Sequence, residues 1–464
     1  MNAPSSPAAI ALNRFGLGAR PDEPVPAEPR RWLLEQFARY EPVPAAWAAQ
    51  PRTGAQVVQY LAEQRAFRGE ADAQKKVAAQ QAFRQESRDQ YIAAAGARVA
   101  SALQSQAPFV ERLVHFWSNH FAVSVDKIVV VGLAGAFEAD AIRPHVLGRF
   151  EDMLLAVARH PAMLLYLDQA NSIGPDSPAG RRSAQRDEGR RRGLNENLAR
   201  EILELHTLGV RSGYTQADVT EFARALTGWS VPGPDAREPV PGEGEGAFMF
   251  RPQIHEPGAR TLLGRTYAQA GEAQARAILH DLATAPATAK HIATKLARHF
   301  VADEPPPALV ERLAQTFLDS GGDLPRVYRV LVESREAWQA NAGKFKSPWD
   351  WAISSLRALG RSEMPPAQVA ALMNQLAQPV WRPGSPAGYD DAAATWAAPD
   401  ALLRRVEVAQ RVASQSGDRI DARQLAPRVL PGVLSEATAA AIARAESPGS
   451  GLALLLVSPE FLRR

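Results

Sequence analysis

A helix-forming segment near the middle of the chain carries two glutamates that project in the same direction. In NENLAREILELHTLG (195–209), Asn197, Arg200, Glu201 and Glu204 recur at i, i+3, i+4 and i+7, so they share one helix face. Two carboxylates three residues apart suit either a divalent cation or a pair of groups for acid–base chemistry. The sequence leaves both alternatives open, and the two glutamates are the metal ligands if a metal is bound.

The surroundings of this polar stripe favour a binding cleft, although a solvated helix face is the more common arrangement. Arg200 stands four residues before Glu204, as in an ordinary surface ion pair. The stripe also follows an arginine-rich loop, residues 181–192, and Tyr214 and Trp229 lie close by in sequence. Aromatic side chains mixed with arginines and carboxylates are typical of clefts for polar or anionic ligands.

His120 has an unusual position for a polar side chain. It lies on the apolar stripe of a helix expected near residues 108–121, together with Phe109, Leu113 and Phe116. Burial there would shift the pKa of the imidazole or fix its tautomer, which suits proton transfer. A hydrogen-bonded core histidine is the more frequent arrangement.

Two further histidines are placed differently. His115 lies four residues after Glu111, and we interpret these two as a solvent-exposed pair. His255 follows an expected strand and precedes Glu256 in a turn, and loop positions of this kind are enriched at functional sites. We therefore include His255, and not His115, among the candidate catalytic residues.

The composition excludes several classes of chemistry. The 464 residues include no cysteine, which excludes disulfides, thiolate metal sites and cysteine nucleophiles. The sequence contains no Walker loop, no G-x-S-x-G elbow and no H-E-x-x-H zinc helix. The formal charge of +3, from 53 basic and 50 acidic residues, is too small to indicate nucleic acid as a partner.

No segment predicts insertion into a membrane. The apolar runs at 163–167 and 452–457 are too short to span a bilayer. The first residues lack a basic region followed by a long apolar run, as a signal peptide would have. We therefore expect no membrane partner and a cytoplasmic location.

The spacing of apolar residues predicts an all-α protein of many helices with one small β-hairpin. Residues 195–208 and 215–227 are expected to form a helical hairpin, in which Gly209 ends the first helix and Thr215 caps the second. Its inward face is expected to consist of Leu198, Ile202, Leu205, Phe222 and Leu226.

Two parts of the chain differ in composition. We expect an N-terminal helical part, residues 1–107, and a main helical domain, residues 108–464, with one continuous domain as the alternative. Residues 231–267 are rich in proline and glycine and are expected to form an insertion. Its β-hairpin lies near residues 248–267, with a turn expected at 256–258.

Six motifs distributed along the chain point to one family. They are RLVHFWSNHFAVS at 112–124, LDQANSIGP at 167–175, NENLAREILELHTLGV at 195–210, YTQADVTEFARALTGW at 214–229, FRPQIHEPGARTLLG at 250–264 and LLLVSPEFLRR at 454–464. Together they resemble the domain-of-unknown-function family catalogued as 1800, over nearly the whole chain. Taken together these motifs are highly specific, although none of them is so alone.

The resemblance implies an uncharacterised bacterial protein whose relatives are often exported and often encoded beside a sulfatase-like protein, a candidate partner. The shared polar residues of the family correspond here to Asn119, His120, Asp168, Asn195, Glu196, Asn197, Arg200, Glu201, Glu204, His206 and His255. Ser118 stands where the family usually has histidine, and Glu256 stands where it tends to have aspartate. If the family uses that histidine as a metal ligand, the resemblance implies weak or no metal binding here.

These residues lead to one functional hypothesis and one rival. The hypothesis is an enzyme, a hydrolase or transferase, that acts on a small or polymeric polar or anionic substrate in a helical cleft. Its catalytic residues are Glu201, Glu204, His120 and His255, and its substrate-binding residues are Asn119, Asp168, Asn195, Asn197, Arg200, Tyr214 and Trp229. The cofactor, if there is one, is a divalent cation on the two glutamates. The rival is a non-catalytic binding or assembly module that uses the same cleft.

Overall fold

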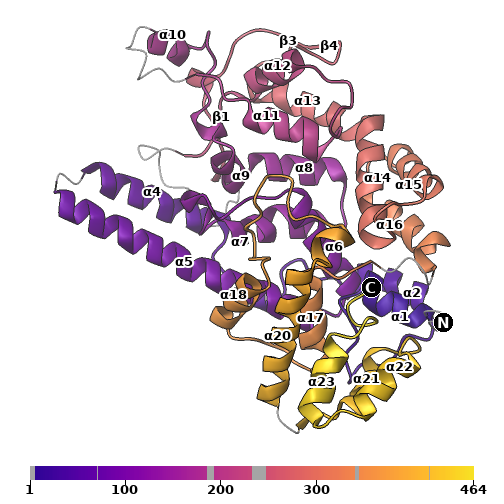
Figure 1. The fold of residues 1–464 in the computed structure, drawn as a ribbon. Helices are drawn as coiled ribbons and strands as arrows, with labels where there is room; N and C mark the ends of the chain where they lie inside the picture. The colour runs from indigo at the N-terminus through magenta and orange to yellow at the C-terminus, as the bar shows by residue number, and fades with distance from the viewer. Residues whose placement is uncertain (1–5, 70–71, 185–192, 233–246, 340–343, 417–418) are drawn as a thin grey trace.

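The structure is a computed structural model that describes residues 6–69, 72–184, 193–232, 247–339, 344–416 and 419–464. Helices make up most of the described chain, and the two small antiparallel sheets have two strands each. The predicted all-α class is confirmed (Figure 1).

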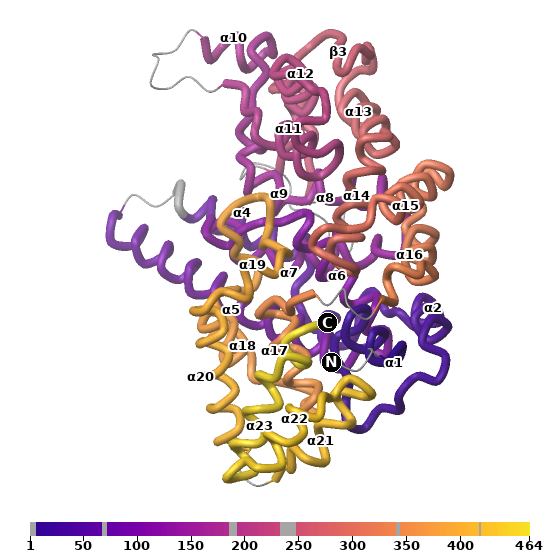
Figure 2. The backbone as a smooth tube through the Cα atoms, turned by 45° about the vertical axis from the view of Figure 1, so that its right-hand side comes forward, coloured from indigo at the N-terminus to yellow at the C-terminus, as the bar shows by residue number. Residues whose placement is uncertain are grey.

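The first third of the chain supplies a central helix and a long projecting helix pair. Its helices are α1 (Pro7–Ile10), η1 (Ala11–Phe15), α2 (Pro29–Arg39), α3 (Ala45–Ala48), α4 (Thr53–Gly69), α5 (Ala73–Gln104), α6 (Pro108–His120), η2 (Ile128–Val130), α7 (Ala134–Phe137), η3 (Glu138–Ile142) and η4 (Arg143–His145). Helices α4 and α5 run side by side and extend away from the rest of the protein (Figures 1 and 2). Helix α6 lies in the centre, and each of its residues except Asn119 is buried.

The middle third lies at the top of Figure 1 and contains the strands. Its elements are α8 (Phe150–Arg159), α9 (Pro161–Tyr166), η5 (Gln169–Asn171), α10 (Pro178–Ala184), α11 (Asn197–Glu201), η7 (Ile202–His206), α12 (Gln216–Leu226), β1 (Trp229–Ser230), β2 (Met249–Phe250), η9 (Pro252–Ile254), β3 (Arg260–Leu262) and β4 (Arg265–Tyr267). The predicted caps are confirmed: Thr215 and Asp218 form a reciprocal capping box on α12, and Gly209 has a φ of 92° after η7.

The last third forms the right-hand and lower parts of Figure 1. Its helices are α13 (Glu272–Thr284), α14 (Pro286–Phe300), α15 (Pro307–Asp319), α16 (Leu324–Glu333), η10 (Glu336–Trp338), α17 (Pro348–Ala358), α18 (Pro366–Gln375), α19 (Ala393–Trp396), α20 (Pro399–Ser416), α21 (Ala422–Val429), α22 (Glu436–Ala443) and α23 (Pro448–Leu456). Many of them begin with proline, which fits the first helical turn because the amide groups there need no partner within the helix.

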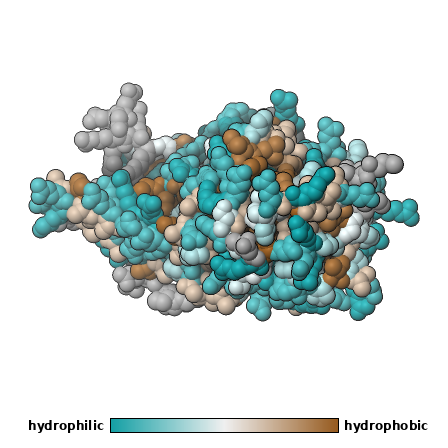
Figure 3. Space-filling model, turned by 60° about the horizontal axis from the view of Figure 1, so that its bottom comes forward, coloured by the Kyte–Doolittle hydropathy of each residue, from teal (hydrophilic) through white to brown (hydrophobic). Residues whose placement is uncertain are grey.

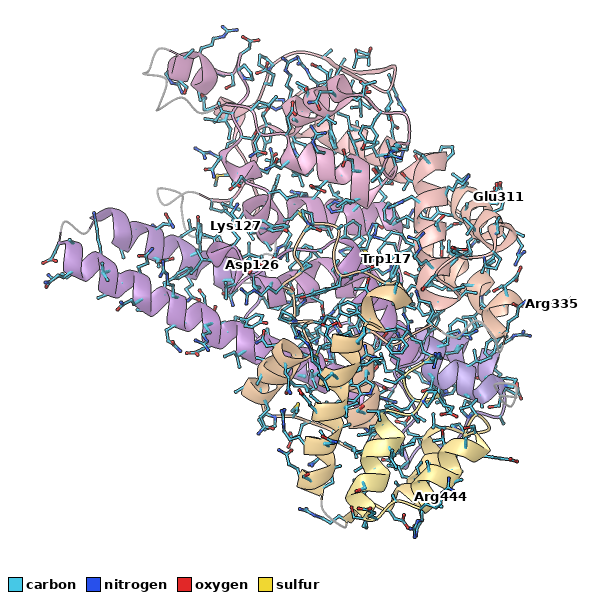
Figure 4. The ribbon with its side chains drawn as sticks, in the orientation of Figure 1. Trp117, Asp126, Lys127, Glu311, Arg335 and Arg444 are labelled. Carbon is cyan, nitrogen blue, oxygen red and sulfur yellow. The ribbon has the colours of Figure 1, made fainter. Side chains whose placement is uncertain are left out.

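One cluster of buried apolar side chains extends from Ile10 to Leu462 and joins segments that are distant in sequence. Helix α5 packs on α17 and α18, and α2 packs on α16. At the centre, Trp117 of α6 donates its indole N–H to the Tyr328 hydroxyl at 2.6 Å (Figure 4). Whether residues 1–107 form a separate domain stays a prediction.

The predicted β-hairpin is present near residues 248–267, but its turn lies at a different position. Strand β3 pairs with β4 around Leu263 and Gly264, both of which have a positive φ, as a two-residue hairpin turn requires. Strand β2 pairs instead with β1, which lies before the insertion. The expected turn at 256–258 is wrong because this segment does not join two paired strands. It is held instead by Glu256, whose buried carboxylate accepts the Asp176 amide at 2.8 Å.

A π-helical turn changes which side of the α11 segment is buried. Helix α11 continues directly into η7, and a π turn adds a residue that rotates the side chains following it. As a result Leu203 and His206 are buried, whereas Leu205, which we predicted to point inward, is only half-buried. The four other residues of the predicted inward face are buried.

We expect Leu203→Ala to lower the free energy of unfolding by about 2–5 kcal/mol, because Leu203 is fully buried and its truncation leaves a cavity. Leu205→Ala serves as the matched control and should cost less than about 1.5 kcal/mol, since part of that side chain already contacts solvent. Urea unfolding measures both values. An equal cost, or the reverse order, would contradict the π-turn register.

One face of the described chain is mainly polar (Figure 3). Among the described residues, no helix is both long and apolar enough to cross a membrane. The face seen from the bottom of Figure 1 is mostly hydrophilic, with separate hydrophobic patches (Figure 3). Leu403 of α20 and Leu454 of α23 are two exposed apolar side chains of this part of the fold.

Candidate functional site

A cavity of about 390 Å³ lies beside the central helix α6. Its wall comes from α5, α6, α14, the start of α17 and the segment 378–391 that follows α18. These elements are far apart in sequence, so the cavity exists only in the folded chain. Its volume falls within the range of small-molecule sites.

The segment 378–391 is held against α6 by Asn119. The side-chain amide of Asn119 donates to the Tyr389 carbonyl at 2.9 Å, and its carbonyl accepts the Tyr389 amide at 2.7 Å. Gly388 has a φ of 82°, and a Cβ there would come within 2.3 Å of the Asn119 backbone oxygen. Glycine is therefore required at this close approach, and the polar groups of Asn119 are used to fix the cavity wall.

The same segment contains a strained residue. Trp381 lines the cavity with a φ of 48°, which is unfavourable for a bulky side chain. The strain is offset by fixed contacts: the indole N–H donates to Glu138 Oε2 at 3.0 Å, and the Trp381 carbonyl accepts the Val125 amide at 2.9 Å. Such strain is concentrated at binding and active sites.

His299 of α14 and Asp391 form a pair at the cavity wall. Nδ1 of His299 lies 2.8 Å from Asp391 Oδ2, so the ring donates its Nδ1–H and leaves a lone pair on Nε2. Nε2 has no hydrogen-bond partner among the described residues. Burial lowers the pKa of His299 to about 4, against the opposing effect of Asp391, so the ring is neutral at pH 7.

Asp391 stays ionised because two cations and a hydrogen bond from His299 oppose the effect of burial. Burial alone would raise its pKa, but His299, Arg464 and Lys344 together lower it. Arg464 Nη2 lies 3.2 Å from Asp391 Oδ1, and Lys344 Nζ lies 3.8 Å from the same oxygen. An ionised carboxylate in this position fixes both the tautomer and the orientation of His299.

Lys295 differs from Arg98 and Arg112 of the cavity wall because its charge has no partner among the described residues, and from Arg298, which donates Nε to the Asp303 carbonyl at 3.2 Å. Arg98 lies 2.9 Å from Glu138, and Arg112 lies 2.9 Å from Asp350. Within the part of the chain that the structure describes, Lys295 makes neither an ion pair nor a hydrogen bond. Burial lowers its pKa to about 8, with Asp391 acting in the opposite direction. Lys295 lies one turn before His299 on α14, so an anionic ligand would meet both side chains.

His115 and Glu111 are not a solvent-exposed pair, as we had predicted from their spacing. Both are buried because α6 is surrounded on all sides, and Glu111 accepts two hydrogen bonds of 2.8 Å from Arg143. The indole of Trp349 donates to His115 Nδ1 at 3.1 Å. His115 is therefore the Nε2–H tautomer, and burial holds its pKa well below 6.5.

His120 lines the cavity and is also hydrogen-bonded in the core. Its Nε2 donates to the His206 carbonyl at 3.2 Å, which leaves Nδ1 without a partner among the described residues. Burial holds the pKa of His120 well below 6.5. Through this bond the C-terminal end of the α11 segment contacts the wall of the cavity.

The comparison with known families agrees with the sequence motifs. A protein family of unknown function, DUF1800, has a model that matches residues 10–463. The chain belongs to this family. No curated protein and no solved structure matches the chain.

The DUF1800 positions singled out in the sequence occupy three separate places in the fold. Asn119 and His120 line the cavity, as does Ser118, which stands where the family usually has histidine. Arg200, Glu204 and Tyr214 lie together around α11, and none of them belongs to the cavity wall. Asn195, Glu196, Asn197, Glu201 and His206 belong to the same segment as Arg200, whereas Asp168 precedes η5 and His255 follows η9.

The α11 group is a partly solvated cluster. Arg200 lies 3.3 Å from Glu196 and 3.6 Å from Glu204, whose side chain is 28% exposed. Burial and the neighbouring Glu204 raise the pKa of Glu201. Burial and a hydrogen bond to Glu204 raise the pKa of Tyr214 to about 12. The catalytic role of Glu201 and Glu204 stays a prediction.

The other predicted binding residues have structural partners. Asp168 pairs with Lys127 at 2.5 Å, to the left of Trp117 in Figure 4. Asn195 accepts the backbone amide of Asn197 at 2.9 Å, which fixes the start of α11. Trp229 is fully buried in β1 and packs edge-on against Phe248 at 5.4 Å between ring centroids, while its indole N–H has no hydrogen-bond partner among the described residues. Their roles in substrate binding stay predictions.

His255 lies apart from the cavity wall. Its Nδ1–H donates to the Thr227 carbonyl at 2.7 Å, and its ring contacts Phe250 edge-on at 5.2 Å between centroids. Burial lowers its pKa. The structure therefore does not place His255 with His120.

Among the described residues, no group of three or more histidine, aspartate or glutamate side chains is arranged to hold a metal ion. We therefore propose no metal for Glu201 and Glu204. Residues 185–192, most of the arginine-rich loop, lie outside the described residues.

Sequence reasoning missed Lys295, His299 and Asp391. The first two carried a signal, because His291, Lys295 and His299 recur at intervals of four and so share one face of α14. Asp391 carried none, since it stands in an irregular segment 92 residues after its partner His299.

Proposed function

We propose that the protein is an enzyme, a hydrolase or transferase, that binds a small anionic substrate in the cavity beside α6. The observation that carries the proposal is the unpaired ammonium of Lys295, one helical turn from a neutral His299 held by Asp391. In this reaction the cation binds the anionic group of the substrate. His299 accepts a proton at Nε2 from the water or hydroxyl group that attacks the substrate.

Several features of the wall support proton transfer at His299. Asp391 keeps the proton on Nδ1 and stabilises the imidazolium once Nε2 has accepted a second one. The ring of Phe116 lies 5.3 Å from that of His299 and limits the access of water. A bound anion beside His299 would raise its low pKa toward the range in which a general base is effective.

The second candidate is a non-catalytic binding or assembly module that uses the same cavity. It is favoured by the low pKa of His299, about 4, which makes the free imidazole a weak base. The two candidates differ in measurable ways. A binding module holds the anion through Lys295 and releases it unchanged, whereas the enzyme also needs His299 and Asp391 for turnover.

Binding of inorganic phosphate tests the anion site. With the chloride concentration and ionic strength fixed, phosphate should raise the melting temperature of the wild type saturably. Lys295→Met should weaken phosphate binding by about 10- to 100-fold, the value of a hydrogen bond to a charged group. Lys290→Met is the matched control, because Lys290 is exposed on the same helix. Equal phosphate affinity in all three proteins would remove the proposal.

Turnover separates the two candidates. The 4-nitrophenyl esters of phosphate, sulfate and acetate are suitable first substrates, since release of nitrophenolate is read directly. The enzyme proposal expects hydrolysis of an anionic ester that Lys295→Met abolishes. The paired glutamates of α11, the cytoplasmic location and the sulfatase-like partner stay predictions from the sequence.

A further inference from the structure

Four basic side chains beside the cavity surround a single carboxylate, that of Asp350, and of these residues Arg112 and Asp350 also line the cavity. We call Arg112, Lys346, Arg405 and Arg464 the basic cluster, and each of them is at most 5% exposed, with Lys346 and Arg405 at 1%. Arg112 lies 2.9 Å and Arg464 lies 3.2 Å from Asp350. Arg405 donates Nη2 to the Lys346 carbonyl at 2.8 Å.

The basic cluster carries more positive charge than the nearby carboxylates neutralise. Asp350 is shared by Arg112 and Arg464, and the pKa values of Lys346 and Arg405 also respond to it. Asp391, the next carboxylate, is shared by Lys344, His299 and Arg464, so Lys346 and Arg405 have no carboxylate in direct contact among the described residues. An unbalanced buried charge is costly, so the folded chain needs an additional negative group or the loss of a proton.

Hydrogen bonds in the basic cluster are also incomplete. Arg405 Nε and Nη1 and Arg464 Nη1 are buried and have no acceptor among the described residues. Lys346 donates to the Ser354 hydroxyl at 3.1 Å and otherwise faces the ring of Phe461 at 4.3 Å. Several donors without acceptors, in a region of excess positive charge, mark the position of a missing acceptor.

Three changes would reduce the excess charge and the number of unpaired donors in this region to different extents: loss of a proton, a bound water molecule and a bound anion. Burial lowers the pKa of Lys346 to about 7; Asp350 opposes this shift, and Arg112, Arg464 and Arg405 add to it. Loss of that proton removes one charge but leaves the arginine N–H groups without acceptors. A water molecule accepts hydrogen bonds but leaves the charge. A small anion does both.

We infer that the basic cluster binds one small inorganic anion, of the size and charge of chloride, through Arg405, Arg464 and Lys346. Arg405, Arg464 and Lys346 do not line the cavity, so the site is separate from it. Residues 462–464 close it, because the backbones of Lys344 and Arg464 exchange hydrogen bonds of 3.0 and 2.8 Å. The anion is a structural component of the fold, distinct from the substrate anion assigned to Lys295.

The melting temperature in different sodium salts tests the inference. At constant ionic strength, replacing gluconate with chloride or bromide should raise the melting temperature of the wild type saturably, by about 2–4 °C. Arg405→Met should remove this halide-specific rise. Arg404→Met, which removes an exposed arginine next in sequence, should retain it. The same melting temperature in gluconate and chloride, or an equal rise in Arg405→Met, would overturn the inference.

Two further measurements do not depend on the folding of a variant. Because a bound anion raises the pKa of Lys346, the difference between chloride and gluconate should be larger at pH 6.5 than at pH 8.5. Crystals grown in bromide should show an anomalous peak within hydrogen-bond distance of Arg405 and Arg464. A pH-independent difference would contradict the role of Lys346, and the absence of a bromide peak would reject the site itself.

Discussion

Acidification from pH 7.5 to pH 5.5 is expected to remove most of the stability of the protein, because four buried histidines and the partly buried His299 must take up protons when it unfolds. Burial is the first cause of each lowered pKa. The pKa of His160 and His299 is about 4, that of His206 is about 3, and those of His115 and His120 lie well below 6.5.

The direction of this pH effect follows from the protonation of histidine in the unfolded and in the folded protein. An unfolded histidine has a pKa of about 6.5, so it gains a proton as the pH falls below that value, while the folded, buried ring stays neutral. Stability from this source is fully present above pH 6.5 and is lost as the pH falls toward about 4. Near pH 5.5 each such histidine contributes a slope of about 1.4 kcal/mol per pH unit.

Urea unfolding at pH 7.5, 6.5 and 5.5 measures this slope directly. His206→Gln should reduce this slope by about 1.4 kcal/mol per pH unit, the effect of one proton. Neither ring nitrogen of His206 has a hydrogen-bond partner among the described residues. Leu203→Ala is the control, because it destabilises the same π turn at every pH without changing the number of protons. A free energy of unfolding that is constant between pH 7.5 and 5.5 would show that these rings are accessible to solvent in the folded state.

The parts of the fold that were predictable from sequence are those with local causes. The capping box of Thr215 and Asp218, the glycine after η7 and the apolar spacing of α12 act over a few residues, so each appears in the sequence as a pattern. The π turn also lies within one segment. The extra residue of the π turn breaks the regular helical period on which the prediction depended. Leu205 therefore does not point toward the core as predicted.

The cavity was only partly predictable because its chemistry depends on contacts between distant segments. His120 was identified because a polar residue on an apolar stripe stands out within one helix. The spacing of His115 and Glu111 suggested a surface pair, but the charge that Glu111 meets comes from Arg143, 32 residues away. The role of Asp391 depends on the packing of its segment on α14, which the sequence does not show.

The α11 cluster and the cavity also differ in the pairing of their cations, which the spacing of residues along a helix does not reveal. Each has a cation at helical spacing from a second polar group, but Arg200 is paired with Glu196 and Glu204, while Lys295 has no partner among the described residues. A paired cation on a partly exposed face contributes little to binding. An unpaired cation in a buried wall is available to a ligand, and this difference places the proposed function at α14.

Replacement of Asp391 by asparagine is expected to lower turnover by about 100- to 10,000-fold, the usual contribution of general acid–base catalysis. The amide side chain cannot stabilise the imidazolium that forms when His299 accepts a proton, and it no longer enforces the Nδ1–H tautomer. Phosphate should still bind, since Lys295 is unchanged. Asp390→Asn is the matched control, because it removes the same charge one residue away. The carboxylate that contacts His299 is that of Asp391, not that of Asp390.

A positioning role for Asp391 predicts more than a loss of rate. Asp391 raises the pKa of His299 against the effect of burial, so in Asp391→Asn the ring should titrate at a still lower pH in an NMR titration. His299→Gln should lose as much activity as Asp391→Asn, and the double variant should lose little more, because the two side chains act as a unit. Circular dichroism must show that Asp391→Asn is folded, since Arg464 and Lys344 lose a partner. A folded variant with unchanged turnover would assign Asp391 to stability alone.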